Sequence, residues 1–162
     1  CLQMKGFVHS VNISDGGVPK SPVSAANVVS GGLEGDYNRF RDENRRGDPD
    51  RAVCIFSLEN IEGLKKEGHP IDVGTTGENF TIRGIDWDSL SEGTVLEIGG
   101  AALELSEPCA PCSKIGGSFV DRRFSRIDHQ KEFGWSRWLA RVVREGRVSV
   151  GDSVNIVITP NH

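Results

Sequence analysis

The chain has 162 residues and a formal net charge of −4, with 26% charged and 36% hydrophobic residues. This length is enough to bury the core of one domain, and we expect a single domain over residues 1–162. The negative charge gives no general attraction to nucleic acid phosphates. The apolar stretches are far shorter than the ~20 residues of a membrane-spanning helix, so we expect neither a nucleic acid nor a membrane partner.

The cysteines favour a reducing compartment. Met4 is the only methionine, which suggests a native start there and makes residues 1–3 an appended remnant; a lipid-bearing first cysteine of an exported protein is the alternative. Cys54 lies in an apolar run and is predicted to be a small buried core residue. Cys109 and Cys112 remain as a pair. So few cysteines argue against a disulfide-stapled scaffold and favour a cytoplasmic location.

The many glycines, 20 in all, indicate tight turns between short strands and predict a mainly β fold. In the first strand, Phe7, Val11 and Ile13 are expected to share one face. Gly99 and Gly100 form the turn of a tight hairpin, whose second strand leads to the cysteine pair. Strands are predicted at residues 7–13, 27–29, 51–56, 80–82, 94–98, 101–105 and 154–158.

Two helices and one long loop complete the expected elements. Ser57 is placed to cap a short helix in which Ile61 and Leu64 face inwards and which Gly68 ends. Residues 31–50 are polar and lack periodicity, which predicts a loop long enough to be functional.

The second expected helix lies near the C-terminus and ends at Gly146. Its tryptophans should anchor the core, and its arginines, Arg137, Arg141 and Arg144, should lie on the opposite side. The apolar residues that recur at helical spacing are Trp135, Trp138, Leu139, Val142 and Val143.

The sharpest local signal is the pair Cys109 and Cys112, which allows three interpretations. A structural zinc site needs about four Cys or His ligands, and only one close pair is present. A thioredoxin-like dithiol fits the spacing, but Gly116 and Gly117 interrupt the helix that should follow the second cysteine. In the third interpretation Cys112 is a thiolate ligand or a sulfur carrier, with Lys114 favouring its ionised form. This role requires an anion-handling pocket.

Three other segments are candidates for that pocket. A lysine holds a phosphate as a point charge, although polar residues of this kind are by default solvated or turn caps. The candidates are Lys20 and Ser21 between two prolines, Gly35 and Asp36 in a glycine-rich loop, and Gly77, Glu78 and Asn79 before a strand.

Taken in this order, the segments resemble the MOSC (molybdenum cofactor sulfurase C-terminal) family from Gly6 to Val157. The order of the pieces along nearly the whole chain makes the match specific. The matching pieces are residues 17–23 (GVPKSPV), 32–36 (GLEGD), 51–53 (RAV), 77–79 (GEN), 92–99, 111–114 (PCSK), 144–146 and 150–152.

The resemblance implies a mostly antiparallel β-barrel with a few short helices and a molybdenum cofactor (molybdopterin) in a cleft. Cys112, flanked by Pro111 and Lys114, matches the cysteine whose sulfur binds the metal. Lys20 and Ser21 match the segment that holds the cofactor phosphate. The residues that match the pterin-lining segment and a Gly-Asp turn at the same cleft are Gly77, Glu78, Asn79 and Asp36.

The chain departs from the family pattern at two positions. Many relatives have an arginine directly after the Gly-Asp turn, where this chain has Tyr37, and many lack a cysteine where this chain has Cys109. The candidates for the replacing arginine are Arg39, Arg51 and Arg122.

The leading functional hypothesis is a molybdenum-dependent oxidoreductase that removes oxygen from small N-hydroxylated compounds. No iron–sulfur spacing or Gly-x-Gly-x-x-Gly fingerprint is visible, so flavin or iron–sulfur partner proteins are expected as electron donors. The alternative is a sulfur carrier with a Cys112 persulfide, any pyridoxal-type desulfurase domain being a separate chain. A dithiol redox protein using Cys109 and Cys112, and a cofactor carrier without turnover, remain as further alternatives.

Overall fold

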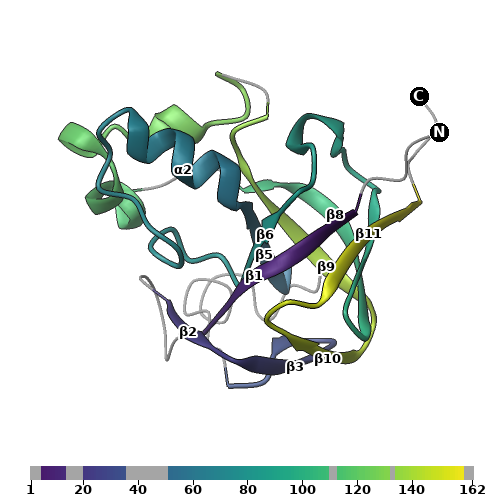
Figure 1. Ribbon diagram of the computed structural model, residues 1–162. Coiled ribbons are helices and arrows are strands. Elements are labelled where there is room, and N and C mark those ends of the chain that lie inside the picture. The colour runs from purple at the N-terminus through teal and green to yellow at the C-terminus, as the bar shows by residue number, and fades with distance from the viewer. Residues whose placement is uncertain (1–4, 14–19, 36–50, 110–112, 132–133, 159–162) are drawn as a thin grey trace.

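The computed structural model describes residues 5–13, 20–35, 51–109, 113–131 and 134–158, and a β-barrel forms its centre (Figure 1). The helix α2 spans Leu58–Lys66, and 3-10 turns lie at η2 (Trp87–Ser89), η3 (Ser113–Ser118), η4 (Val120–Arg122) and η5 (Phe124–Ile127). The strands are β1 (Lys5–Ile13), β2 (Ser21–Val23), β3 (Ala25–Val29), β4 (Gly32–Leu33), β5 (Val53–Ser57), β6 (Phe80–Arg83), β7 (Val95–Ile98), β8 (Ala101–Cys109), β9 (Arg137–Arg144), β10 (Gly146–Ser149) and β11 (Ser153–Ile158).

The barrel closes through the pairing of β1 with β11. In the described part of the chain, neighbouring strands follow the order β1, β11, β7, β8, β9, β5 and β6, and β6 pairs with β1 again. Neighbours are antiparallel except for β5 and β6, which are parallel. Parallel neighbours require a crossover connection, and α2 belongs to that connection. β2 pairs with β1 as an extra strand.

The local sequence explains where α2 begins and which side it buries. The Ser57 hydroxyl accepts a hydrogen bond from the backbone N–H of Asn60 at 3.1 Å, which caps the helix. Ile61 and Leu64, three residues apart on one face, are fully buried. The predicted capped helix after the strand at 51–56 is therefore confirmed.

Two hydrophobic clusters hold the fold, one inside the barrel and one outside it. The inner cluster includes Ile55, Phe80, Leu103 and Trp138. Ile55 and Phe56 are neighbours in β5 and so point to opposite faces of the barrel wall. Phe56 belongs to the outer cluster, together with Ile61 and Leu64 of α2. The buried members of the outer cluster are Phe56, Ile61, Leu64, Ile71, Ile115, Phe119 and Ile127.

The predicted C-terminal helix is wrong, because residues 137–144 form the strand β9 between β8 and β5. Trp138 and Ala140 lie in the inner cluster, and Val142 packs against it, which is the two-residue period of a strand. Apolar residues on the other face of the strand, such as Leu139, add the spacing of three and four residues that is typical of a helix. Tertiary pairing with two strands decides between the two patterns.

Gly146 does not end a helix but lies at the start of β10. A Cβ atom there would lie 2.1 Å from the carbonyl oxygen of Gly100, in the turn between β7 and β8. Only glycine allows this approach. β10 pairs with β3, which pairs with β4, and this small sheet lies at the lower edge of the barrel in Figure 1.

β1 differs from its predicted pattern at one point. Its register with β6 shifts between Val8 and Ser10, the mark of a β-bulge. Val8 and Val11 are therefore both core residues, whereas Phe7 is half-buried under the guanidinium of Arg83 at 4.8 Å. The sequence pattern predicted that Phe7 and Val11 share the buried face, and for Phe7 this prediction is wrong.

The expected fold class, a mostly antiparallel β-barrel with a few short helices, is confirmed. Within the described residues, no helix combines the length and the apolar character that a membrane crossing requires.

Candidate functional site

The end of β8 and the start of β9 bring chemically active side chains together. Cys109, the last residue of β8, pairs with Arg137, the first residue of β9. On the next strand, Cys54 pairs with Leu139. Leu139 and Cys54 alternate with residues of the inner cluster, so both face the outer side of the barrel wall. We call the group of Cys54, Cys109, Arg51 and Arg137 the thiol site.

The two sulfur atoms of the thiol site form a hydrogen-bonded pair. Cys54 is buried and Cys109 is half-buried, and neither forms a disulfide. The hydrogen bond from Cys54 is the main cause that lowers the pKa of Cys109, to about 6, and the positive charges of Arg137 and Arg51 lower it further against burial and Glu107. The same hydrogen bond, together with burial, raises the pKa of Cys54. The arrangement therefore favours the ionised form of Cys109 and the protonated form of Cys54.

The two arginines are fixed by polar contacts. Arg137 is only 5% exposed, and its Nη1 donates to the carbonyl oxygen of Thr76 at 2.7 Å. Arg51 Nη1 donates to Glu107 Oε1 at 2.5 Å. Both guanidinium groups therefore keep their positions beside Cys109.

The predicted segment 77–79 adjoins this site through Asn79. Its side-chain Oδ1 accepts from the backbone N–H of Cys54 at 3.0 Å, and its Nδ2 donates to the carbonyl oxygen of Asn12 at 3.3 Å. The Asn79 side chain thus ties β5 to β1 across the start of β6.

Glu78 is completely buried and accepts three hydrogen bonds. Its carboxylate accepts from Gly74 N–H at 3.1 Å, from the Thr76 hydroxyl at 2.8 Å and from the Thr81 hydroxyl at 2.9 Å. Burial nevertheless raises the pKa of this carboxyl, because the hydrogen bonds offset only part of the lost hydration.

This raised pKa predicts a pH dependence of stability. A proton on Glu78 stabilises the folded state below the ordinary pKa of a glutamate, and that stabilisation is lost as the pH rises through the raised pKa. The free energy of unfolding of the native protein, relative to that of Glu78→Gln, should therefore increase as the pH falls from above the raised pKa of Glu78 toward the ordinary pKa of a glutamate. Urea unfolding of both proteins at several pH values measures this difference. A difference that stays constant with pH would contradict the prediction.

Lys20 lies against the same connection. Its backbone N–H donates to the carbonyl oxygen of Gly74 at 2.9 Å, and the residue is 8% exposed. Gly74 has φ +82°, and a Cβ atom there would lie 2.4 Å from the carbonyl oxygen of Lys20. Glycine is required at this crossing both by the backbone angle and by the close approach. Ser21, the next residue, is exposed at the start of β2.

The other predicted site residues fall into two groups. Asp36, Arg39 and Cys112 lie outside the described residues. Lys114 belongs to η3 and Arg122 to η4, and the Arg122 guanidinium packs over Gly116, where a Cβ atom would lie 2.7 Å from it. The segment of Cys112 therefore joins the end of β8 to η3.

Sequence reasoning missed Arg137 and the contact between Cys54 and Cys109. Arg137 was placed on the far side of a helix, yet it is buried at the start of a strand. The alternation of Trp138, Ala140 and Val142 was the available signal for that strand. No sequence pattern signals the Cys54 contact, because it depends on the order of the strands.

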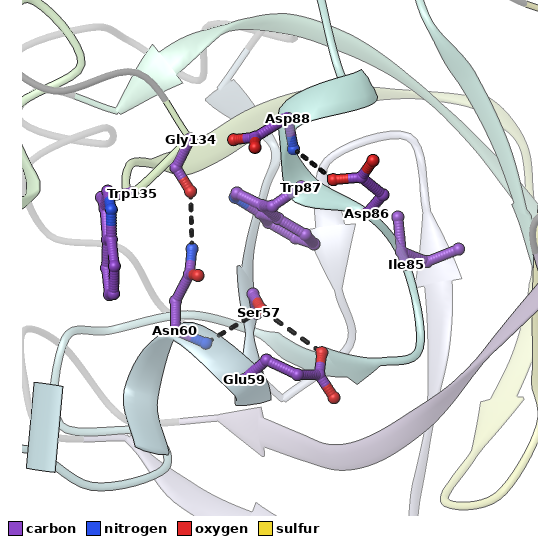
Figure 2. Close-up of a pocket in the computed structure, with 9 residues that line it drawn as sticks. All are labelled: Ser57, Glu59, Asn60, Ile85, Asp86, Trp87, Asp88, Gly134 and Trp135. Atoms are coloured by element: carbon purple, nitrogen blue, oxygen red, sulfur yellow. Dashed lines mark hydrogen bonds between the residues drawn. The ribbon is translucent and has the colours of Figure 1, made fainter. Parts of the chain in front are cut away.

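A separate cavity of about 270 Å³ lies between the start of α2 and η2 (Figure 2). Asn60 Nδ2 donates to the carbonyl oxygen of Gly134 across it at 2.8 Å, and Trp87 Nε1 donates to the carbonyl oxygen of Ser136 at 2.7 Å. None of the residues that line it is a predicted site residue. The lining residues are Ser57, Glu59, Asn60, Ile85, Asp86, Trp87, Asp88, Gly134 and Trp135.

Relatives of known sequence cover most of this chain. "Uncharacterized protein YflK" of Bacillus subtilis is 28% identical over 143 residues, which is 87% of this chain and 63% of YflK. A "Reductase" of Gibberella moniliformis is 28% identical over 120 residues, 70% of this chain and 21% of that protein. "Protein YiiM" of Escherichia coli is 25% identical over 130 residues, 78% of this chain and 56% of YiiM. The chain therefore spans less than two thirds of the length of these relatives.

Solved structures share the fold, and a family model identifies it. YiiM from Geobacillus stearothermophilus matches with a TM-score of 0.71 at 23% identity, over 94% of this chain and 75% of that chain. The YUAD protein from Bacillus subtilis matches with a TM-score of 0.74 at 22% identity, over 94% of this chain and 96% of that chain. The MOSC domain model matches residues 42–155. Since this match covers more than half of the sequence, the chain belongs to the MOSC domain family.

Proposed function

We propose that this chain binds a molybdenum cofactor and works as an oxidoreductase that removes oxygen from small N-hydroxylated compounds. The observation that carries the proposal is the thiol site, where the largely buried Arg137 and the half-buried Arg51 lie beside Cys109, three residues before Cys112. A pocket for an anionic cofactor bound through the Cys112 thiolate needs positive charge of this kind close to its sulfur ligand.

The residues present fit such a cofactor by the chemistry of their donor groups. Sulfur is the soft ligand that suits a metal of this kind. Lys20, largely buried beside the 74–79 connection, supplies a positive charge suited to a phosphate. Arg51 and Arg137 add positive charge next to Cys109. The Glu78 carboxyl group does not compete with sulfur as a metal ligand, because it already accepts three hydrogen bonds.

Each predicted residue has a distinct role in this proposal. Lys20 and Ser21 would hold the phosphate, and Cys112 would be the metal ligand. Gly77 and Asn79 would line the pterin, with Glu78 fixing the fold of their segment. The remaining residues proposed for the cofactor cleft are Asp36, Arg51 and Lys114. When bound, the metal supplies the two-electron redox chemistry.

The chain's own contribution is to orient the substrate, to exclude water and to provide the Cys112 thiolate. The electrons would come from partner proteins that carry a flavin or an iron–sulfur cluster. The similarity to a protein named "Reductase" supports a reductive reaction. It covers only a fifth of that protein, so the substrate and the donor belong to the proposal.

The test is to express the protein in cells that make the molybdenum cofactor and to measure bound molybdenum and pterin. The native protein and Cys109→Ala should carry both, and Cys112→Ala should lose the molybdenum. Cys109→Ala is the matched control, because it removes a thiol from the same segment. An absence of cofactor from every form would refute the proposal. A native chain that carries one extra sulfur atom on Cys112 by intact mass, without metal, would favour the sulfur carrier instead.

A further inference from the structure

The turn of residues 74–77 holds the buried guanidinium of Arg137 through the main chain. Arg137 Nη1 donates to the carbonyl oxygen of Thr76 at 2.7 Å. The turn is closed by a hydrogen bond from the N–H of Gly77 to the carbonyl oxygen of Gly74 at 3.1 Å. A backbone carbonyl points where the local chain conformation directs it. The place of the guanidinium therefore depends on what fixes this turn.

The carboxyl group of Glu78, the residue after the turn, binds the turn at two points. One of its oxygen atoms accepts from the Thr76 hydroxyl at 2.8 Å, and the other accepts from the Gly74 N–H at 3.1 Å. Thr76 is the link, because its hydroxyl binds the carboxyl group and its carbonyl oxygen binds Arg137. Thr76 and Glu78 are both fully buried, so water does not compete for these hydrogen bonds.

The Glu78 carboxyl group is itself anchored to two strands of the barrel. The Thr81 hydroxyl of β6 donates to it at 2.9 Å. In β1, Asn12 Nδ2 donates to the Thr81 hydroxyl at 3.2 Å and to the Glu78 carbonyl oxygen at 3.1 Å, and the Ser10 hydroxyl donates to Asn12 Oδ1 at 2.7 Å. Every residue of this network is buried. Hydrogen bonds thus connect the barrel wall at Ser10 to the guanidinium of Arg137.

We propose that Glu78 is a positioning residue that acts through Thr76 to hold Arg137 beside Cys109. The inference rests on the proposed function, in which Arg137 supplies positive charge close to the sulfur ligand. It gives Glu78 and Thr76 a role that needs no contact with the cofactor. Cys109 and Arg137 are directly paired in β8 and β9, so their side chains lie on the same face of the sheet. Cys109 can therefore report where the arginine is.

The experiment compares the alkylation of Cys109 by anionic iodoacetate and by neutral iodoacetamide. It uses the whole chain with Cys112→Ala, expressed in cells that do not make the molybdenum cofactor, and peptide mass spectrometry follows Cys109. Both reagents attack the thiolate, so the ratio of the two rates cancels its ionised fraction and reports positive charge nearby. In Arg137→Met, the ratio of the iodoacetate rate to the iodoacetamide rate should fall about fivefold, the effect of one unit charge at a few ångströms in water.

Three variants of the network test the positioning role. Glu78→Ala and Thr76→Val should lower the ratio towards that of Arg137→Met, because the turn no longer holds the guanidinium. Loss of the Glu78 charge alone would raise the ratio, so a fall indicates displacement of the arginine. Glu78→Gln should keep the ratio at or above the native value. Its amide oxygen can accept from the Gly74 N–H, and its amide nitrogen can donate to the Thr76 hydroxyl.

Thr94→Val is the matched control for lost stability. Thr94 is fully buried directly before β7, and its hydroxyl accepts from the Ser91 N–H at 3.2 Å. This variant should keep the native ratio, and an equal fall in it would overturn the proposal. A native ratio in Thr76→Val, which decides the matter even if Glu78→Ala does not fold, would also overturn it. The ratio is measured without cofactor, so an absence of cofactor in the binding assay refutes the proposed function and leaves the positioning result unchanged.

Discussion

Replacing Arg137 by methionine is expected to lower the free energy of unfolding by about 2–3 kcal/mol and to raise the pKa of Cys109. The side chain is buried, and its loss leaves the carbonyl oxygen of Thr76 without a charged donor, a contact of about 1.5–3 kcal/mol. The guanidinium also stabilises the Cys109 thiolate, so its removal favours the thiol. The two effects have separate measurements.

Urea unfolding gives the free energy, and the pH profile of alkylation by iodoacetamide gives the pKa. The Cys112→Ala background leaves Cys109 as the sole cysteine in its tryptic peptide. At neutral pH, alkylation of Cys109 should slow several-fold. Arg141→Met is the matched control, because Arg141 lies on the same strand but is exposed, and it pairs with Glu104. Equal effects of the two substitutions would contradict a special role for Arg137.

Replacing Asn79 by alanine is expected to lower the free energy of unfolding by about 2–4 kcal/mol. The substitution strands the backbone N–H of Cys54 and the carbonyl oxygen of Asn12 inside the protein, and each buried unsatisfied group costs about 1–3 kcal/mol. Chemical unfolding measures the change.

The matched control is Asn155→Ala, which removes a half-exposed asparagine from β11 and should change stability by less than about 0.5 kcal/mol. If Asn79→Ala unfolds at the same urea concentration as the control, the two hydrogen bonds do not hold β5 against β1. Loss of cofactor from Asn79→Ala with unchanged stability would instead assign the side chain to binding alone.

Local patterns predicted most of the fold. The Ser57 cap, the Gly99–Gly100 turn and the short apolar runs each depend on neighbouring residues, and the structure contains the corresponding helix, hairpin and strands. The segment at 137–144 was misjudged because strand and helix periods were both present. Pairing partners decided between them, and these come from β5 and β8, about 85 and 35 residues away along the chain.

The candidate site was predictable only in part. Family-like segments pointed to Lys20 and to residues 77–79. The structure brings the two together through Gly74, whose carbonyl oxygen accepts from the Lys20 N–H and whose own N–H donates to the Glu78 carboxyl group. The buried position of Arg137 and the Cys54 contact depend on strand order, which no local pattern contains. The roles of Cys112 and Asp36 in cofactor binding stay predictions, because both residues lie outside the described part of the chain.

The single parallel pair of the barrel has a topological origin. Strand directions cannot alternate around a closed ring that has an odd number of members, and the described barrel has seven. At least one neighbouring pair must therefore run the same way, and here it is β5 and β6. A tight turn cannot join such a pair. Deletions therefore cannot shorten residues 58–79 to a hairpin turn. This connection between parallel strands has to be long, and in this chain it carries Glu78 and Asn79.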